Sequence, residues 1–326
     1  METRLSGQLQ LKAMRRILAT SLAVAFLLGG CKSANEVGPD RLPRFEAPTG
    51  AAPRVALALG SGGPRGFAHI GVLKVLDENG IKADLIVGSS VGAMVGAIYA
   101  DGMNANGLEK LARDINVLEF FEFRMLAGGL ATGSTVQAYV NACVENKTLE
   151  KLPTRFVVAA TRLSDGKLAL FNHGDTGLAV RASAASPGQF EPVPIGNDLF
   201  VDGDEAAPVP ISAARSLGAR LVIAVDVSAY EKDTPPSAPQ SWRDKDARRA
   251  RQVAAESSQA DVVLHPNIGY YAGHDEDYRL RVIAQAEKYT REMLPAIRAA
   301  YARAGLPWPR SQAASMARSP AGEASR

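Results

Sequence analysis

A run of five apolar residues, Val55–Leu59, leads directly into the glycine-rich stretch Gly60–Gly66 and then into a helical pattern from about Phe67 to Glu78. An uninterrupted apolar run of this length is typical of a strand that is buried on both faces, as in a parallel sheet. The same order recurs at once, with a strand pattern at Leu85–Val87 and a helical pattern at Val91–Ala100. Strands that alternate with helices predict a layered α/β fold with a largely parallel central sheet.

The rest of the chain continues this alternation, and we expect one folded domain at residues 54–305, of roughly 250 residues. The final stretch, 306–326, is rich in Ala, Ser, Arg, Pro and Gly without periodicity and predicts a disordered tail. Further strands are expected at Phe156–Ala160, Ala169–Phe171, Leu199–Val201, Leu221–Val227 and Val262–Leu264. Further helices are expected at Leu108–Ile115, Thr135–Glu145, Leu178–Ala184 and Tyr278–Ala304, the last with a break at Pro295.

The N-terminus has the pattern of a secretion signal. Met14-Arg15-Arg16 precedes the uncharged apolar run Ile17–Gly30, which is too short to span a bilayer comfortably. Residues 1–30 are therefore interpreted as a signal peptide, with 1–13 upstream of a start at Met14. The run ends in Leu28-Gly29-Gly30-Cys31, which resembles a bacterial lipobox. That resemblance implies lipidation of Cys31, and the alternatives are an ordinary secretory signal or a short membrane anchor.

Residues 31–53 contain Pro, Gly, Asn and Glu without periodicity, and they are expected to form a tether between the lipidated cysteine and the domain. Lys32, directly after the cysteine, resembles the outer-membrane sorting pattern of Gram-negative lipoproteins. The expected location is thus the outer membrane, facing the periplasm.

Charge and cysteine content exclude several classes of function. The net charge is +3, and the one dense basic run, Arg243–Arg251, also contains acids, so a solvated helix face is favoured over nucleic-acid contact. Two cysteines make no disulfide framework. Cys143 lies on an apolar helical face and is expected to be a buried free thiol.

Gly88-Ser89-Ser90-Val91-Gly92 is a G-x-S-x-G pattern between a strand and a helix, the context of a nucleophile elbow. In such a turn Ser90 is exposed at a helix N-terminus, where negative charge is favoured. Side chains at Gly88 and Gly92 are expected to collide with the neighbouring strand and helix. The pattern alone is weak, since a helix N-cap serine after a tight turn is the alternative.

The loop Gly60–Gly66 presents several backbone N–H groups to an anion. A dinucleotide phosphate site is disfavoured, because Arg65 stands where the G-x-G-x-x-G pattern requires its last glycine. We favour an oxyanion hole for an intermediate formed by Ser90, because the first two parallel strands end on the same side of the sheet.

A serine nucleophile also needs a base. His265 and His274 follow Asp202 and fit the order Ser, Asp, His of α/β-hydrolases. Asp202, at a strand end and followed by Gly203, is the other candidate, although burial near Ser90 has to strengthen a carboxylate for this role.

In this order the motifs resemble those of the patatin-like phospholipase family. Gly62–Gly66 resembles its glycine-rich loop, Gly88–Gly92 its serine elbow, Arg181–Gly188 the stretch before its Asp-Gly motif, and Val201–Gly203 that motif itself. The resemblance covers about residues 54–228. It implies a three-layer α/β/α fold, with Ser90 as nucleophile, Asp202 as base, no metal and no cofactor. The oxyanion hole would be formed by Gly62, Gly63, Arg65 and Gly66.

The implied activity is hydrolysis of acyl esters of phospholipids or other lipids through an acyl-enzyme, as in phospholipase A or lysophospholipase reactions. Two residues depart from the family pattern: Asp204, where glycine or alanine is usual, and Ser61, where many members carry glycine. A second carboxylate beside Asp202 raises the pKa of that residue or crowds the dyad. The alternatives are a Ser-His-Asp carboxylesterase and a lipid-binding lipoprotein with weakened catalysis. Head group, acyl position, chain length and oligomeric state are not fixed by the sequence.

Overall fold

The computed structural model describes residues 36–116, 120, 129–230 and 234–309. The predicted signal peptide, Cys31 and residues 310–326 of the predicted tail lie outside these ranges. A single compact unit begins at Val37, which precedes the start predicted at Arg54. Residues 37–53 of the predicted tether belong to this unit: Arg41 forms an ion pair with Asp175, and the Arg44 amide donates to the His173 carbonyl.

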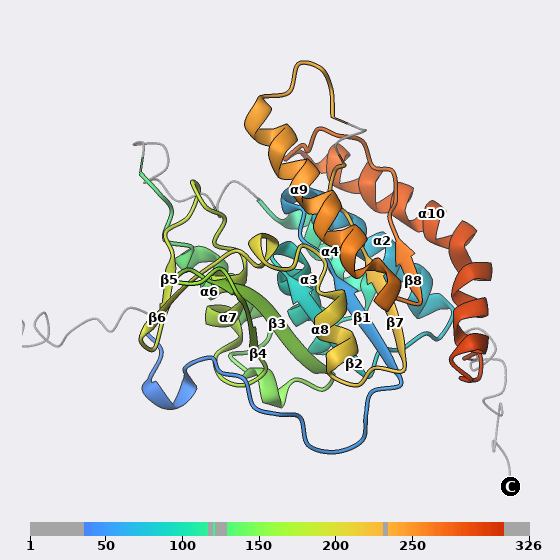
Figure 1. The fold of residues 1–326 in the computed structure, drawn as a ribbon, viewed down its shortest axis with the longest axis horizontal. Coiled ribbons are helices and arrows are strands. Elements are labelled where there is room, and N and C mark those ends of the chain that lie inside the picture. The colour runs from blue at the N-terminus through green and yellow to red at the C-terminus, as the bar shows by residue number, and fades with distance from the viewer. Residues whose placement is uncertain (1–35, 117–119, 121–128, 231–233, 310–326) are drawn as a thin grey trace, which may run out of the picture. The chain divides into compact units, whose positions relative to one another are not determined.

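The centre of this unit is a mostly parallel sheet between two layers of helices (Figure 1). The strand order is β5-β6-β3-β2-β1-β7-β8, and β4 pairs with β3. Strands β3, β2, β1, β7 and β8 pair in parallel, whereas β4 and β6 each pair antiparallel with β3, and β5 pairs antiparallel with β6. The strands are β1 Val55–Leu59, β2 Leu85–Ser89, β3 Arg155–Arg162, β4 Leu168–Phe171, β5 Val193–Ile195, β6 Asp198–Val201, β7 Leu221–Val225 and β8 Val262–Leu264.

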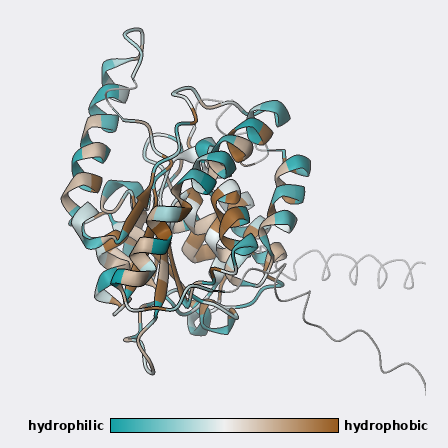
Figure 2. Cartoon of the chain, turned by 90° about the vertical axis from the view of Figure 1, so that its right-hand side faces the viewer, coloured by the Kyte–Doolittle hydropathy of each residue, from teal (hydrophilic) through white to brown (hydrophobic). Residues whose placement is uncertain are grey.

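Alternation along the strands divides the core in two. Leu57 and Leu59 of β1 pack in the larger cluster, with helices α2, α3 and α10, whereas Ala56 and Ala58 face the smaller one, with α8 and α9. Figure 1 shows α8 and α9 in front of the strands, and Figure 2 shows the strands as the most hydrophobic layer. The helices are α2 Ala68–Glu78, α3 Val91–Ala100, α4 Ala105–Asp114, α6 Ser134–Cys143, α7 Thr176–Ser183, α8 Ile211–Ser216, α9 Gln240–Glu256 and α10 Glu276–Arg303.

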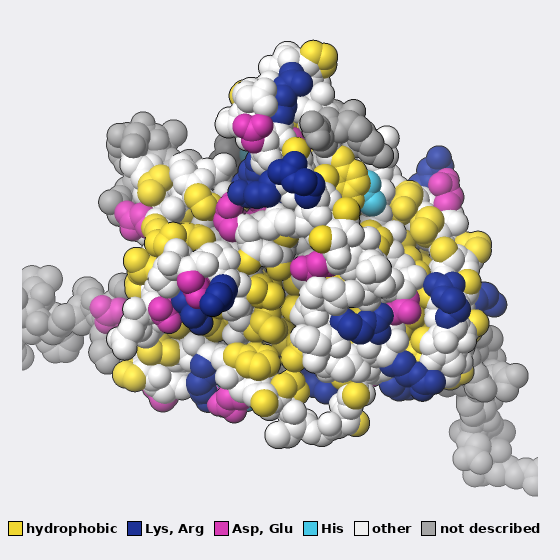
Figure 3. Space-filling view, in the orientation of Figure 1, with side chains coloured by type: hydrophobic (Ala, Val, Ile, Leu, Met, Phe, Trp, Pro, Cys, Tyr) yellow, Lys and Arg dark blue, Asp and Glu magenta, His cyan; other side chains and the backbone are white. Residues whose placement is uncertain are grey.

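Two local predictions are wrong. Helix α10 runs without a break through Pro295, whose position is exposed, so that water can satisfy the carbonyl that loses its partner. Cys143 is free but only half-buried. Among the described residues, no helix has the length and apolar character to cross a membrane. On the face drawn in Figure 3, basic and acidic side chains are interspersed among apolar ones.

Candidate active site

The turn between β2 and α3 holds Ser90 in a backbone conformation that only a few residues adopt. Its φ is 54° and its ψ is −122°, which is strained for a residue with a side chain. The flanking glycines allow the turn. A Cβ on Gly88 would lie 2.6 Å from the Ala93 Cα, and one on Gly92 would lie 2.2 Å from the Leu59 carbonyl oxygen. The predicted collisions with helix and strand are therefore present.

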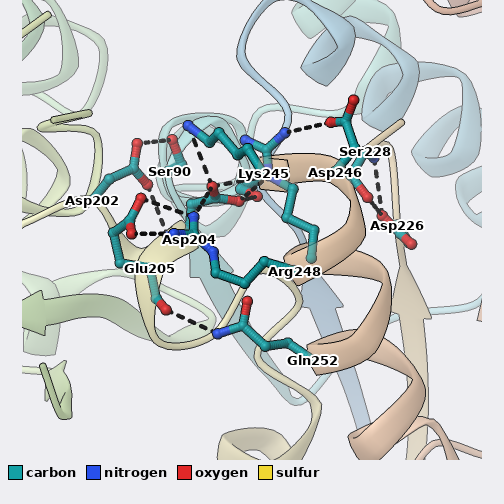
Figure 4. A network of polar contacts seen from close by, with 12 residues as sticks. Ser90, Asp202, Asp204, Glu205, Asp226, Ser228, Lys245, Asp246, Arg248 and Gln252 are labelled. Atoms are coloured by element: carbon teal, nitrogen blue, oxygen red, sulfur yellow. Dashed lines mark hydrogen bonds and ion pairs between the residues drawn. The ribbon is translucent and has the colours of Figure 1, made fainter. Parts of the chain in front are cut away.

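Ser90 and Asp202 meet at the carboxyl ends of β2 and β6. The Ser90 Oγ donates a hydrogen bond to Asp202 Oδ2 at 3.0 Å (Figure 4). Two backbone contacts fix the aspartate, because its N–H donates to the Ala185 carbonyl and its own carbonyl accepts from Thr161 Oγ1. The structure thus brings together two residues that are 112 positions apart in the chain.

The position after Asp202, which Gly203 occupies, has no room for a side chain. A Cβ at this position would lie 2.4 Å from the Ala159 carbonyl oxygen and 2.5 Å from Ser89 Oγ. Any side chain would therefore push the Asp202 segment away from β3 and β2. The glycine is required by this close approach.

Burial and a neighbouring charge strengthen Asp202 as a base. Desolvation first, and then the negative charge of Asp204, raise its pKa from an ordinary 3.8 to about 7. The Asp204 N–H donates to Asp202 Oδ1 at 2.9 Å, which partly opposes the shift. The predicted effect of the second carboxylate on this pKa is therefore confirmed in direction.

Asp204 is itself neutralised by a partner that the sequence did not identify. Its side chain is 1% exposed, and Arg249 of α9 donates from Nε to its two oxygens at 2.7 and 2.9 Å. Burial opposes ionisation of Asp204, but the charge and hydrogen bonds of Arg249, the charge of Lys245 and the Ser61 hydrogen bond together outweigh it and lower the pKa. Ser61 Oγ also donates to Asp204. The two departures from the family pattern, Ser61 and Asp204, are thus hydrogen-bonded to each other.

The glycine loop borders the same site. Within the described residues, the N–H groups of Gly62 and Gly63 donate no hydrogen bond, whereas the Arg65 N–H already donates to the Gly62 carbonyl. Gly66 lets the loop approach the start of α3, since a Cβ there would lie 2.2 Å from Val91 Cγ2. Gly62 and Gly63 are therefore the better placed of the four predicted donors.

Ser183, at the end of α7, connects the elbow to β3 by two hydrogen bonds. Its Oγ accepts from the Ser90 N–H at 2.8 Å and donates to the Ala159 carbonyl at 2.6 Å. The Ser90 amide is consequently not free to bind an oxyanion. The sequence had placed Ser183 only within the stretch that precedes the Asp-Gly motif.

Most histidines have partners away from Ser90. His69 is buried, its Nε2 contacts the Gly60 carbonyl at 2.9 Å, and burial lowers its pKa to about 4. His173 forms an ion pair with Glu46 when protonated. His265 Nδ1 lies 3.3 Å from Asp226 Oδ2. His274 lines the cavity described next, so it is the histidine that a triad mechanism would have to use.

A cavity of about 550 Å³ opens onto Ser90 and Asp202. One part of its wall is apolar, and helix α9 supplies a polar part. The apolar residues include Ile70, Met94, Ile98, Leu108, Leu111 and Val136. Phe120 also lines it and packs edge-to-face against Tyr139. Among the described residues, no cluster of three or more potential metal ligands was found.

The part of the chain that carries Ser90 and Asp202 matches a known protein family. The family model for patatin-like phospholipase matches residues 57–215, which contain the glycine loop, the elbow and the Asp-Gly turn. Residues 57–215 belong to the patatin-like phospholipase family. The match ends before β7, so that α9, with Arg249, lies outside it.

The relatives that this chain matches are longer proteins. An uncharacterised NTE family protein of Mycobacterium bovis is 34% identical over 203 residues, which cover 60% of this chain and 56% of that protein. A lysophospholipase of Coccidioides immitis is 33% identical over 187 residues, or 56% of this chain and 12% of that protein. The chain therefore matches about half of the first relative and a small part of the second. Among solved structures, VipD from Legionella pneumophila aligns with a TM-score of 0.46 at 13% identity, covering 82% of this chain and 72% of that one.

Proposed function

We propose that this protein is a serine lipid acyl hydrolase of the phospholipase A or lysophospholipase type, which acts through a Ser90–Asp202 dyad and an acyl-enzyme. The hydrogen bond from Ser90 Oγ to Asp202 Oδ2, at 3.0 Å, is the observation that carries the proposal. Membership of the patatin-like phospholipase family and the similarity to a lysophospholipase support the lipid ester as substrate.

In the first half-reaction, Ser90 Oγ attacks the acyl carbonyl carbon and its proton passes to Asp202. The raised pKa of Asp202, near 7, suits a group that takes a proton and later returns it. The oxyanion of the tetrahedral intermediate accepts hydrogen bonds from the Gly62 and Gly63 amides. Asp202 then protonates the leaving alcohol oxygen, and the acyl group stays on Ser90.

In the second half-reaction, Asp202 takes a proton from a water molecule that attacks the acyl-enzyme. The carbon–Oγ bond breaks, Ser90 regains its proton from Asp202, and the fatty acid leaves. The apolar part of the cavity wall, with Met94 and Ile98, is suited to the acyl chain.

A fluorophosphonate probe and a panel of phospholipids and short acyl esters test this proposal. We expect wild type to be labelled, Ser90→Ala to be unlabelled, and Asp202→Asn to lose about a thousandfold or more in kcat/KM. His265→Ala and His274→Ala are the matched controls and should stay within about threefold of wild type. An inactive but folded His274→Ala would favour a triad esterase, and an unlabelled wild type would favour a lipid-binding lipoprotein that has lost catalysis.

We also propose that the mature chain begins at a lipidated Cys31 and is anchored to the outer membrane facing the periplasm. The lipobox resemblance and the preceding apolar run support this proposal. Palmitate labelling of the expressed chain should occur in wild type and be absent in Cys31→Ala. Equal labelling of both would contradict the anchor.

A further inference from the structure

One face of helix α9 forms part of the cavity wall. Trp242, Lys245, Asp246 and Arg249 all line the cavity, and their spacing of three, one and three positions places them on one side of a helix. The same segment was interpreted from the sequence as a solvated face. That prediction is wrong for this side of α9, because Asp246 and Arg249 are buried.

The charges on this face differ in how they are partnered. Arg249 is bonded to Asp204, and Asp246 accepts from the Tyr270 hydroxyl at 3.0 Å. Within the part of the chain that the structure describes, Lys245 Nζ has one ion-pair contact, 3.6 Å from Asp204 Oδ2, which is longer than a hydrogen bond. Since Asp204 already accepts from Arg249 and Ser61, the Lys245 ammonium keeps its donors for another acceptor.

Lys245 lies close to the reacting atoms. A chain of three contacts joins it to the nucleophile: Lys245 to Asp204 at 3.6 Å, Asp204 N to Asp202 Oδ1 at 2.9 Å, and Asp202 Oδ2 to Ser90 Oγ at 3.0 Å. Figure 4 shows the Lys245 side chain extending from α9 toward Ser90 and Asp202. The side chain is 34% exposed, so a ligand in the cavity can reach it.

The other charged groups of the wall are less suited to a new anion. Arg65 donates from Nη2 to the Tyr270 carbonyl, and its Nε has no hydrogen-bond partner among the described residues but is buried, so it is less accessible to a ligand than the Lys245 ammonium. Asp202 and Asp246 repel anions when they are ionised. An amphiphile with an apolar chain on the side of Met94 and an anion beside Lys245 would therefore match both parts of the wall.

We propose that the Lys245 ammonium binds the phosphate group of the substrate and selects phosphate-bearing acyl esters over neutral ones. The inference rests on the proposed function and adds to it the subsite that decides the substrate class. A charge-assisted hydrogen bond to a phosphate oxygen is expected to strengthen binding by about tenfold. Lys245 lies outside the segment shared with the family, at residues 57–215, so this preference is expected to vary among relatives.

The first experiment measures binding without hydrolysis. Isothermal titration calorimetry compares dodecylphosphocholine with the neutral dodecyl tetraethylene glycol ether, below their micelle concentrations, on the full chain. Lys245→Gln should weaken phosphocholine binding about tenfold and leave the neutral ligand within about twofold. Lys245→Arg should keep most of the affinity. Arg251→Gln, which removes one exposed charge from the same helix, is the matched control and should change neither ligand.

Inorganic phosphate distinguishes a lipid head group from a free anion. We expect it to compete only weakly with dodecylphosphocholine, because it lacks the chain that fills the apolar part of the cavity. Competition by phosphate at the affinity of the amphiphile would overturn the head-group assignment. Equal losses for both ligands in Lys245→Gln, or no loss for either, would overturn the subsite.

The second experiment measures kcat/KM for lysophosphatidylcholine and for a monoacylglycerol with the same acyl chain. Lys245→Gln should lose about tenfold on the first and under about twofold on the second. Equal losses on both would instead make Lys245 a positioning residue that acts through Asp204 and Asp202. If wild type hydrolyses neither ester, the proposed function fails, and the binding experiment still decides the role of Lys245.

Discussion

The Arg249 Nε lies 2.7 and 2.9 Å from the two carboxylate oxygens of Asp204, and both side chains are buried. This ion pair joins α9 to the turn that carries the candidate catalytic aspartate. It explains how a second carboxylate is accommodated two positions after Asp202. Four predictions follow from this pair and from the contacts around the elbow.

Removing Arg249 should destabilise the fold strongly. Arg249→Leu removes the close charge partner of the buried Asp204 and leaves only the longer contacts to Lys245 and Arg248, at 3.6 and 3.8 Å. This is expected to lower the free energy of unfolding by about 3–5 kcal/mol. Urea denaturation measures this loss in the free energy of unfolding. The double variant Asp204→Asn/Arg249→Leu should recover much of the loss. Arg291→Leu removes two surface pairs, with Glu78 and Glu287, and should cost less than about 1 kcal/mol. A similar loss for both single variants would contradict the importance of burial.

Neutralising Asp204 should move the pH profile. The Asp204 charge raises the pKa of Asp202, so Asp204→Asn lowers that pKa. Asp202 is then ionised at lower pH, and the acid limb of the kcat/KM profile should shift to lower pH by about one pH unit. Glu205→Gln removes a neighbouring, partly buried carboxylate that pairs with Arg248, and it should shift the acid limb less. An acid limb that stays in place or moves up would show that Asp204 does not act on Asp202.

Asp202→Asn should give up activity and gain stability at alkaline pH. The pKa of Asp202 is raised from 3.8 to about 7 in the folded chain, so ionisation favours the unfolded chain, and stability is lost as pH rises through this window. Asparagine does not ionise. The melting temperature of Asp202→Asn should exceed that of wild type most clearly at pH 8, with a gap that narrows toward pH 4. A difference in melting temperature that is the same at every pH would rule out ionisation of Asp202 as the cause of the difference.

Ser183→Ala should weaken the elbow without touching the substrate. The Ser90 N–H and the Ala159 carbonyl both lose their partner, at a cost of about 1–3 kcal/mol. We expect kcat to fall about tenfold with little change in KM, because the nucleophile is less well positioned. Ser216→Ala removes a comparable hydroxyl-to-carbonyl bond on α8 and should leave kcat unchanged. A selective rise in KM would instead indicate a binding role for Ser183.

The meeting of Ser90 with Asp202 was predictable because each carries a local signature. Gly88 and Gly92 mark a sharp turn, and Gly203 marks a second one at a strand end. Strand β6 is antiparallel to β3, so the rule that parallel strands end at one edge does not bring Asp202 to Ser90. The order of the motifs in the family resemblance placed the two side chains together. The strand β1 and the helix α3 were predicted with the bounds that the structure has.

The pair of Asp204 with Arg249 was not predictable in this way. The two residues are 45 positions apart, and no local pattern indicates which of several basic residues on α9 turns inward. The buried side of α9 carries charges where a core-facing helix usually carries apolar residues, so periodicity gave no signal. Ser61 was named only as a departure from glycine, and nothing in the sequence indicated that its hydroxyl contributes to the same network.

The order of the strands has a practical consequence for truncated forms of this protein. Strand β7, at Leu221–Val225, pairs with all five residues of β1, but it follows the last residue of the family match, 215. A polypeptide cut at that point would turn β1 into an open edge of unpaired amides flanked by apolar side chains, which invites aggregation. The segment shared with relatives is therefore shorter than the smallest piece expected to remain soluble, and trimmed versions for expression should extend at least through α10.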